Sequence, residues 1–239
     1  MSNRDNISKL IVDSNNKTLL ERKEYTVFNS INLYIKDAFT EDIDLTRVIQ
    51  KLESSIPRSL ATDIDMIIVG QFDFLLDREV TALYKDAAIY VSNEQGTEDG
   101  LLEDLIHEFA HATETKFGNQ IYADNTLQQE FLGKRLRLYS MLHHHQELPD
   151  GINKNDFINM EFSNKFDMFL YRYLGYDKLK NYISGLFMSP YGATSLREYF
   201  ANSFEEYYMG DRSYLKKVSP VVYSKIETID LSAREEEYV

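Results

Sequence analysis

Helical periodicity dominates the chain after residue 100, whereas the segments that are typical of β-strands lie before it. In the strand-like segments, apolar residues such as Ile67, Ile68 and Val69 follow one another in short runs. Elsewhere, apolar residues recur every three or four positions, as they do in helices that bury one face. The sequence therefore predicts an α+β fold. The expected strands span 65–76 and 87–91, and the expected helices span 25–39, 42–56, 100–117, 127–143, 156–174, 195–209 and 221–229.

The expected helix 100–117 ends at Gly118, and the turn near residues 118–124 is the expected boundary between two lobes. A chain of 239 residues can bury enough core for two lobes that share a cleft. We expect residues 1–118 to form an N-terminal lobe with the small sheet and the central helix. We expect residues 119–239 to form a mainly helical C-terminal lobe.

The balance of charges excludes several classes of partner. The formal net charge is −13, whereas a nucleic-acid-binding surface needs basic residues that displace counterions from phosphates. An acidic surface also repels anionic membranes, and no segment approaches the roughly 20 apolar residues that span a bilayer. We expect neither nucleic acid nor a membrane among the partners of this protein.

Residues 1–18 are rich in polar side chains and contain no apolar run long enough for a signal peptide. The chain has no cysteine, which fits a reducing compartment. We expect a cytoplasmic protein, or part of an assembly made in the cytoplasm. Secretion would require that an export signal had been removed.

The segment His107-Glu108-Phe109-Ala110-His111 is the main functional signal in the sequence. Two imidazoles four residues apart project from adjacent turns of a helix toward one point, which suits a single zinc ion. Because cysteine is absent, zinc would have to bind imidazole and carboxylate groups. Glu108 is then placed to hold a water molecule and to take its proton. The motif predicts a zinc endopeptidase that acts on a protein or peptide substrate.

The residues around this motif divide the expected helix into an apolar and a polar side. His107 and His111 lie on the polar side with three acids, any of which could accept the second ring N–H of a ligating histidine. The alternative is a solvated polar face that binds no metal. The apolar side consists of Leu102, Leu105, Ile106 and Phe109, and the three acids are Glu103, Asp104 and Glu114.

A catalytic zinc site needs a third protein ligand. In the metzincin arrangement this is a histidine six residues after the second one, but Phe117 occupies that position. A glutamate on a downstream helix is the other usual solution, and spacing does not choose among the candidates. These are Glu130, Glu161, Glu198, Glu205 and Glu206.

The segment Glu198-Tyr199-Phe200-Ala201-Asn202-Ser203-Phe204, with Tyr191 seven residues before Glu198, resembles the catalytic domain of anthrax lethal factor and the related Pro-Pro endopeptidases. The resemblance covers the central helix and residues 191–204, with weaker likeness at 87–91. It implies a zincin-like metallopeptidase in which Glu198 is the third zinc ligand and Tyr191 stabilises the tetrahedral intermediate. Lethal factor has a second acid one turn after its glutamate ligand, where this sequence has Asn202, which cannot carry a negative charge.

Both of these assignments have structural alternatives. Ser195-Leu196-Arg197-Glu198 also matches a capping box, which would use the Glu198 carboxylate to close the start of a helix. Tyr191 could be an ordinary aromatic residue of a loop. The whole domain could also be a catalytically silent zincin-like component of a larger protein assembly.

Three further segments carry weaker signals. Zinc peptidases usually place an edge strand beside the cleft, and the strand 87–91 could be that edge and pair with an extended substrate, or it could be a core strand. Residues 143–145 are three consecutive histidines, which point in different directions on a helix and indicate a helix end rather than a second metal site. Residues 233–239 are expected to form a frayed acidic tail.

Overall fold

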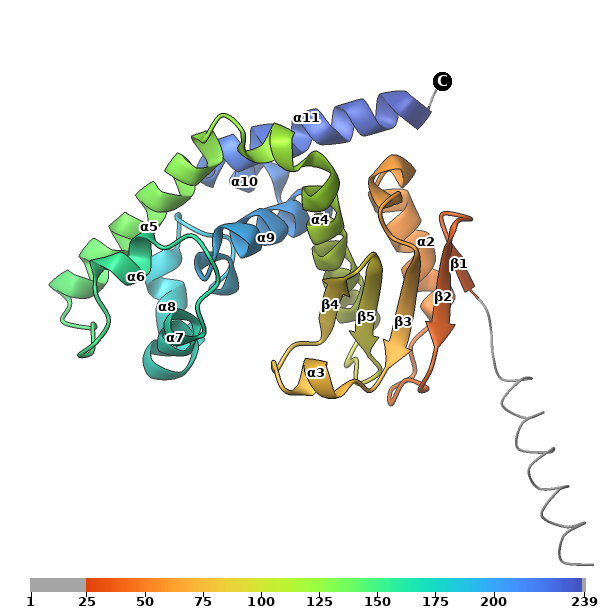
Figure 1. Cartoon of the computed structure of the whole chain (residues 1–239), viewed down its shortest axis with the longest axis horizontal. Coiled ribbons are helices and arrows are strands. Elements are labelled where there is room, and N and C mark those ends of the chain that lie inside the picture. Colours follow the sequence, from red (N-terminus) through yellow and green to blue (C-terminus); the bar gives the residue numbers. More distant parts are fainter. Residues whose placement is uncertain (1–24, 238–239) are drawn as a thin grey trace, which may run out of the picture.

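A five-stranded mixed β-sheet forms the first part of the protein in the computed structural model, which describes residues 25–237 (Figure 1). The order of the strands is β1-β2-β3-β5-β4. The three central strands β2, β3 and β5 are parallel, and the edge strands β1 and β4 are antiparallel to their neighbours. The strands are β1 (Tyr25–Val27), β2 (Ile31–Ile35), β3 (Met66–Gly70), β4 (Ala82–Lys85) and β5 (Ala88–Ser92).

Within the described residues, three helical segments lie between the strands and the other helices follow β5, which confirms the α+β class. None of the helices within residues 25–237 is long and apolar enough to cross a membrane. The expectation for residues 1–18 lies outside the described residues. The helices are α2 (Leu45–Ser55), η1 (Arg58–Ala61), α3 (Asp73–Leu76), α4 (Glu98–Tyr122), α5 (Thr126–His144), α6 (Lys154–Ile158), α7 (Asn164–Met168), the π-helical turn η2 (Phe169–Gly175), α8 (Tyr176–Ile183), η3 (Tyr191–Ala193), α9 (Leu196–Met209), α10 (Arg212–Val218) and α11 (Pro220–Glu237).

Most of the expected helices are present. Helices α2, α5 and α9 confirm those expected at 42–56, 127–143 and 195–209. Helix α11 is longer than the segment 221–229 and reaches Glu237, so residues 233–237 are helical and not a frayed tail. Its side chain Ala233 is buried, and Glu237 accepts a hydrogen bond from the backbone of Arg58.

The helix expected over residues 25–39 is wrong, because this segment contains the β1–β2 hairpin. Phe28 and Asn29 have φ angles of 52° and 54°, a left-handed conformation that reverses the chain. Val27 and Ile31 face each other across the ladder, and both are buried. Their spacing imitates a helical period, although it arises from two paired positions on either side of a tight turn.

The strand expected at 87–91 is confirmed by β5, but β5 lies inside the sheet and is not its edge. The edge strand beside α4 is β4, which the sequence did not reveal. Asp86 and Ala87 join β4 to β5 with φ angles of 52° and 60°. Turns of this kind usually carry Asn-Gly or Asp-Gly, so an Asp-Ala pair gave no hairpin signal.

The strand expected over residues 65–76 is only partly correct, since β3 ends at Gly70 and α3 begins at Asp73. A Cβ atom at Gly70 would lie 2.8 Å from the carboxylate of Asp37. That carboxylate also accepts a hydrogen bond of 2.9 Å from the backbone N–H of Gln71. The chain leaves the ladder where this side chain approaches the backbone.

Helix α4 packs against β4 and β5 on one side and against α9 on the other, so it lies between the sheet and the helical part (Figure 1). It does not end at Gly118 as expected, but continues to Tyr122. The left-handed residue that reverses the chain is Asn125, with φ 58°. Phe109 of α4 is fully buried and its ring lies 6.1 Å from that of Phe28.

The single helix expected over 156–174 is also wrong, because the segment is divided into α6, α7 and η2. Asn159 ends α6 in an extended conformation. The aromatic residues that suggested one helix are buried nonetheless, because Phe157 and Phe166 pack edge to face with ring centroids 4.9 Å apart. Two short helices thus meet at one aromatic cluster.

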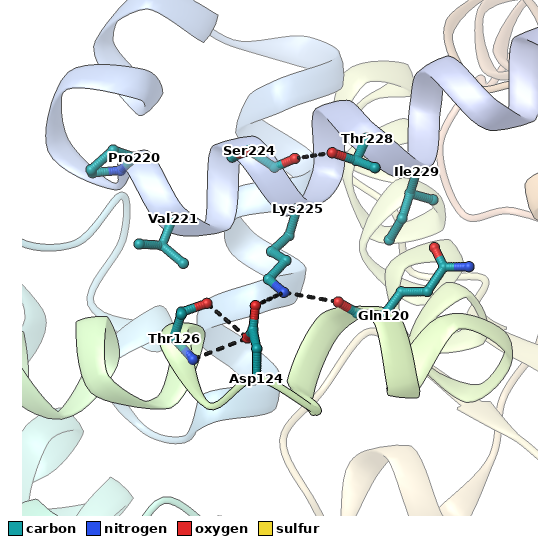
Figure 2. Close-up of a pocket in the computed structure, with 9 residues that line it drawn as sticks. All are labelled: Gln120, Asp124, Thr126, Pro220, Val221, Ser224, Lys225, Thr228 and Ile229. Carbon is teal, nitrogen blue, oxygen red and sulfur yellow. Dashed lines mark hydrogen bonds and ion pairs between the residues drawn. The ribbon is translucent and has the colours of Figure 1, made fainter.

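Helix α11 links the two halves of the chain. Ser59 and Arg234 tie its C-terminal part to the first half, since Ser59 Oγ donates to the carbonyl of Ala233 at 2.9 Å and Arg234 donates to that of Ser55 at 3.2 Å. Near its start, Lys225 donates to Asp124 at 2.7 Å and to the Gln120 carbonyl at 2.9 Å (Figure 2). Figure 2 shows these bonds in a pocket between α11 and the α4–α5 turn.

Glu130 should be a main anchor of α11. Its carboxylate accepts hydrogen bonds from the N–H groups of Val221 and Val222 at 2.9 and 3.1 Å, and from the Tyr199 hydroxyl at 2.8 Å. Glu130→Ala leaves these donors unpaired, so we expect a loss of about 2 kcal/mol in the free energy of unfolding, measured in urea. The control is Glu161→Ala, at an exposed position. Equal unfolding midpoints for the two variants would contradict this role.

Candidate metal centre

Helix α4 presents His107 and His111 on the same side. Thr97 caps the start of the helix, because its hydroxyl accepts a hydrogen bond of 3.0 Å from the N–H of Gly100. The two histidines are one turn apart, and their ring centroids are separated by 5.1 Å. The opposite side of the helix is apolar and buried, as expected, through Leu102, Leu105, Ile106 and Phe109.

Helix α9 brings Glu198 to the two histidines. Glu198 Oε2 lies 3.0 Å from His107 Nε2 and 3.7 Å from His111 Nε2. Ser195 caps the helix by accepting a hydrogen bond of 3.2 Å from the backbone N–H of Glu198. Only this half of the expected capping box is observed, because the Glu198 carboxylate faces the histidines.

The geometry of these three residues fits a divalent ion with nitrogen and oxygen ligands. Their potential ligand atoms all lie within 4.8 Å of one another, and no other cluster of this kind occurs in residues 25–237. Two imidazoles and one carboxylate are a known ligand set of catalytic zinc. Ligands at 2.0 to 2.1 Å in a tetrahedron are roughly 3.3 Å apart, which is close to the separations around Glu198.

Electrostatics favour positive charge between the three side chains. Burial lowers the pKa of His107, but hydrogen bonds to Glu198 and Glu205 outweigh it and raise the pKa to about 10. Burial likewise opposes a charge on His111, but Glu114 and Glu198 raise its pKa to about 9. Burial raises the pKa of Glu198, yet the two histidines lower it to about 2. A metal cation bound to neutral imidazoles would likewise place positive charge beside the Glu198 carboxylate.

Each histidine also has an acid at its other ring nitrogen. His111 Nδ1 lies 2.9 Å from Glu114, and His107 Nδ1 lies 3.4 Å from Glu205. Glu114 was one of three acids expected in this role, whereas Glu205 was considered only as a metal ligand. Asp104 instead accepts a hydrogen bond of 2.9 Å from Gln95. Both Nε2 atoms are therefore directed to Glu198 while both Nδ1 atoms are held by carboxylates.

Glu114 is buried and connects the centre to two residues that the sequence analysis missed. It accepts hydrogen bonds from the Tyr122 hydroxyl and from Arg197 Nε, the latter at 3.3 Å. Tyr122 comes from the last turn of α4 and Arg197 from the first turn of α9. Glu114 thus fastens the two helices together beside His111.

Glu108 lies on the same turn of α4 and is buried. Its carboxylate accepts a hydrogen bond from the backbone N–H of Tyr84 on β4. Burial raises the pKa of Glu108, against the opposing effect of the positive charges on His111 and His107. A carboxylate with a raised pKa is a stronger proton acceptor, as a general base requires.

Tyr191 lies beside the centre, in the short helix η3 that precedes α9. Its ring centroid is 6.2 Å from that of His107. Burial and the nearby charge of Glu198 raise the pKa of the Tyr191 phenol far above its usual range, so the hydroxyl stays protonated and can donate. The Tyr191 ring therefore lies next to His107, in the short helix η3.

Asn202 supports the turn that carries Tyr191. Its side-chain oxygen accepts a hydrogen bond from the Ser189 hydroxyl, which in turn accepts one of 3.2 Å from the N–H of Gly192. A Cβ at Gly192 would lie 3.4 Å from Asn202 Cβ. The amide at this position therefore holds the polypeptide around Tyr191.

The remaining candidates lie elsewhere. Glu130 binds the start of α11, and Glu206 accepts a hydrogen bond of 2.8 Å from the backbone of Asp211. Glu161 is exposed in the link between α6 and α7. Residues 143–145 lie at the C-terminal end of α5, as expected.

Comparison with models of protein families, with curated proteins and with solved structures finds no match for this chain.

Glu114 should matter for metal binding through His111. A carboxylate that holds the second nitrogen of a ligating histidine typically contributes 10- to 100-fold to metal affinity. We expect Glu114→Gln to weaken zinc binding by about 10-fold or more, measured by competition with a chromophoric chelator. Glu103→Gln is the matched control, since it changes an acid of the same helix that bonds to neither histidine. The same affinity in both variants would refute the role of Glu114.

Proposed function

We propose that this protein is a zinc-dependent endopeptidase of zincin-like architecture, with His107, His111 and Glu198 as the zinc ligands. The observation that carries the proposal is the convergence of the two Nε2 atoms and one carboxylate oxygen. The buried carboxylate of Glu108 is close enough to both histidines to interact with their charges. A core built for stability alone would not gather two further acids behind the histidines. A metal site needs such groups to orient its ligands.

The proposed reaction is hydrolysis of a peptide bond. Zinc, when bound, supplies Lewis acidity that polarises the substrate carbonyl and makes water a stronger acid. Glu108 takes a proton from the water whose oxygen attacks the carbonyl carbon. The Tyr191 hydroxyl donates a hydrogen bond to the resulting oxyanion. Glu108 then gives its proton to the leaving nitrogen as the C–N bond breaks.

The position of the edge strand β4 is a further argument for a peptide substrate. It has β5 on one side only, so its other edge is free of strand partners in the described residues. The N–H of Tyr84 on this strand binds Glu108, which places the edge beside the proposed general base. An extended peptide can pair with such an edge through its backbone.

The zinc assignment predicts one equivalent of tightly bound zinc per chain. We expect elemental analysis to find this equivalent in the purified protein and to find less than about a tenth of it in His107→Ala and His111→Ala, because two ligands cannot complete the site. His144→Ala is the control, since it removes a histidine at the exposed end of α5. Full zinc content in both histidine variants of α4 would exclude this site.

The catalytic assignment predicts a separate effect of Glu108. In a digest of a peptide library, Glu108→Gln should lower the rate of cleavage by about 10²- to 10⁴-fold because it removes the proton acceptor. Its zinc content should equal that of the unchanged protein, because Glu108 is not a ligand. If zinc is bound but the unchanged protein and Glu108→Gln give the same cleavage pattern, the domain is a silent component of an assembly and not a peptidase.

A further inference from the structure

Two consecutive cationic side chains, Lys134 and Arg135, are buried in the middle of α5. Arg135 is fully buried and Lys134 is 8% exposed. Burial lowers the pKa of Lys134 to about 8 and that of Arg135 to about 9, which shows that the environment opposes their charges. Neither forms an ion pair with a carboxylate within residues 25–237; their hydrogen-bond acceptors there are backbone carbonyls and one hydroxyl.

Arg135 holds the end of the turn that carries Tyr191. One nitrogen of its guanidinium donates to the carbonyls of Ala193 and Thr194 at 2.8 and 3.0 Å. The other donates to the carbonyl of Asp156 at 2.6 Å. The guanidinium also stacks on the ring of Phe166, 3.9 Å from its centroid. The guanidinium thus fixes the carbonyls of Ala193 and Thr194, which lie two and three residues after Tyr191 and directly before the α9 cap Ser195.

Lys134 holds the other end of the same segment. Its ammonium donates to the carbonyl of Leu186 at 2.6 Å, where the chain leaves α8. It also donates to the carbonyl of Val218 at 2.9 Å and to the hydroxyl of Ser219 at 2.7 Å. We call residues 186–194 the tyrosine segment. Adjacent residues of α5 therefore fasten it at both ends, with Tyr191 between them.

We propose that Lys134 and Arg135 are positioning residues that fix the tyrosine segment so that the Tyr191 hydroxyl faces the centre formed by His107, His111 and Glu198. This inference rests on the proposed peptidase function. The energetics support a role beyond packing, because apolar side chains often replace buried charges with no loss of stability. Carbonyl oxygens at both ends of a loop, however, need donors at fixed positions, and a cation on a rigid helix supplies several at once.

The test is a double-mutant cycle on peptide cleavage. Arg135→Lys keeps the charge but loses the planar fork, so kcat should fall by about 10- to 100-fold, as small displacements of catalytic groups do, with little change in KM. In the Tyr191→Phe background the same substitution should have no further effect on kcat. Lys134→Met is expected to behave in the same way. Arg137→Lys, at an exposed position of α5, is the matched control and should leave kcat unchanged.

The rate of amide hydrogen exchange gives a second readout, which does not depend on enzymatic activity. Amides of the tyrosine segment should exchange faster in Arg135→Lys and Lys134→Met, whereas those of 100–117 in α4 should exchange as before. Equal losses of kcat with and without Tyr191→Phe, or exchange that is unchanged or faster throughout the protein, would overturn the inference. Absence of cleavage by the unchanged protein would instead refute the proposed function, and the exchange result would still decide whether the two cations hold the segment.

Discussion

The packing of α9 across α4 is the contact on which the candidate centre depends. Helix α4 alone can present His107 and His111, because their relation is fixed by the helical repeat. It cannot supply the carboxylate between them. Glu198 comes from α9, where Glu114 of α4 binds Arg197, the residue before Glu198, and Ser195 caps the first turn. The proposed ligand set is therefore a property of the helix pair and not of either helix.

Burying the charged groups of this centre costs free energy of folding. Glu108, His111 and Glu114 are buried, and Glu198 is held against both imidazoles. Carboxylates in such surroundings are stable only with cations or hydrogen-bond donors close by. The fold supplies fixed donors for some of them, such as the Tyr84 N–H for Glu108. A cation between the two Nε2 atoms and Glu198 would add positive charge beside these buried carboxylates.

Local signals in the sequence were enough to predict the histidine pair and most of the helices, because both follow from the spacing of residues along one element. The proposed third ligand was different, since five glutamates were equally possible by spacing, and only the resemblance pointed to Glu198. Periodicity also gave a wrong prediction where residues are paired by tertiary structure, as Val27 and Ile31 show. These residues pair across a turn, and the same spacing would have placed them on one face of a helix.

The buried cations of α5 show where sequence reasoning could go further. Phe131, Leu138 and Leu142 form the buried stripe of this helix, and their spacing places positions 134 and 135 within that stripe. A lysine or arginine at such a position cannot reach water as surface cations do, so it must find acceptors inside the protein. For Lys134 and Arg135 these acceptors are mainly backbone carbonyls, including those at both ends of the tyrosine segment. Here that segment carries Tyr191. Helix α5 contributes none of the proposed metal ligands, yet under our proposal it fixes the position of the tyrosine beside them.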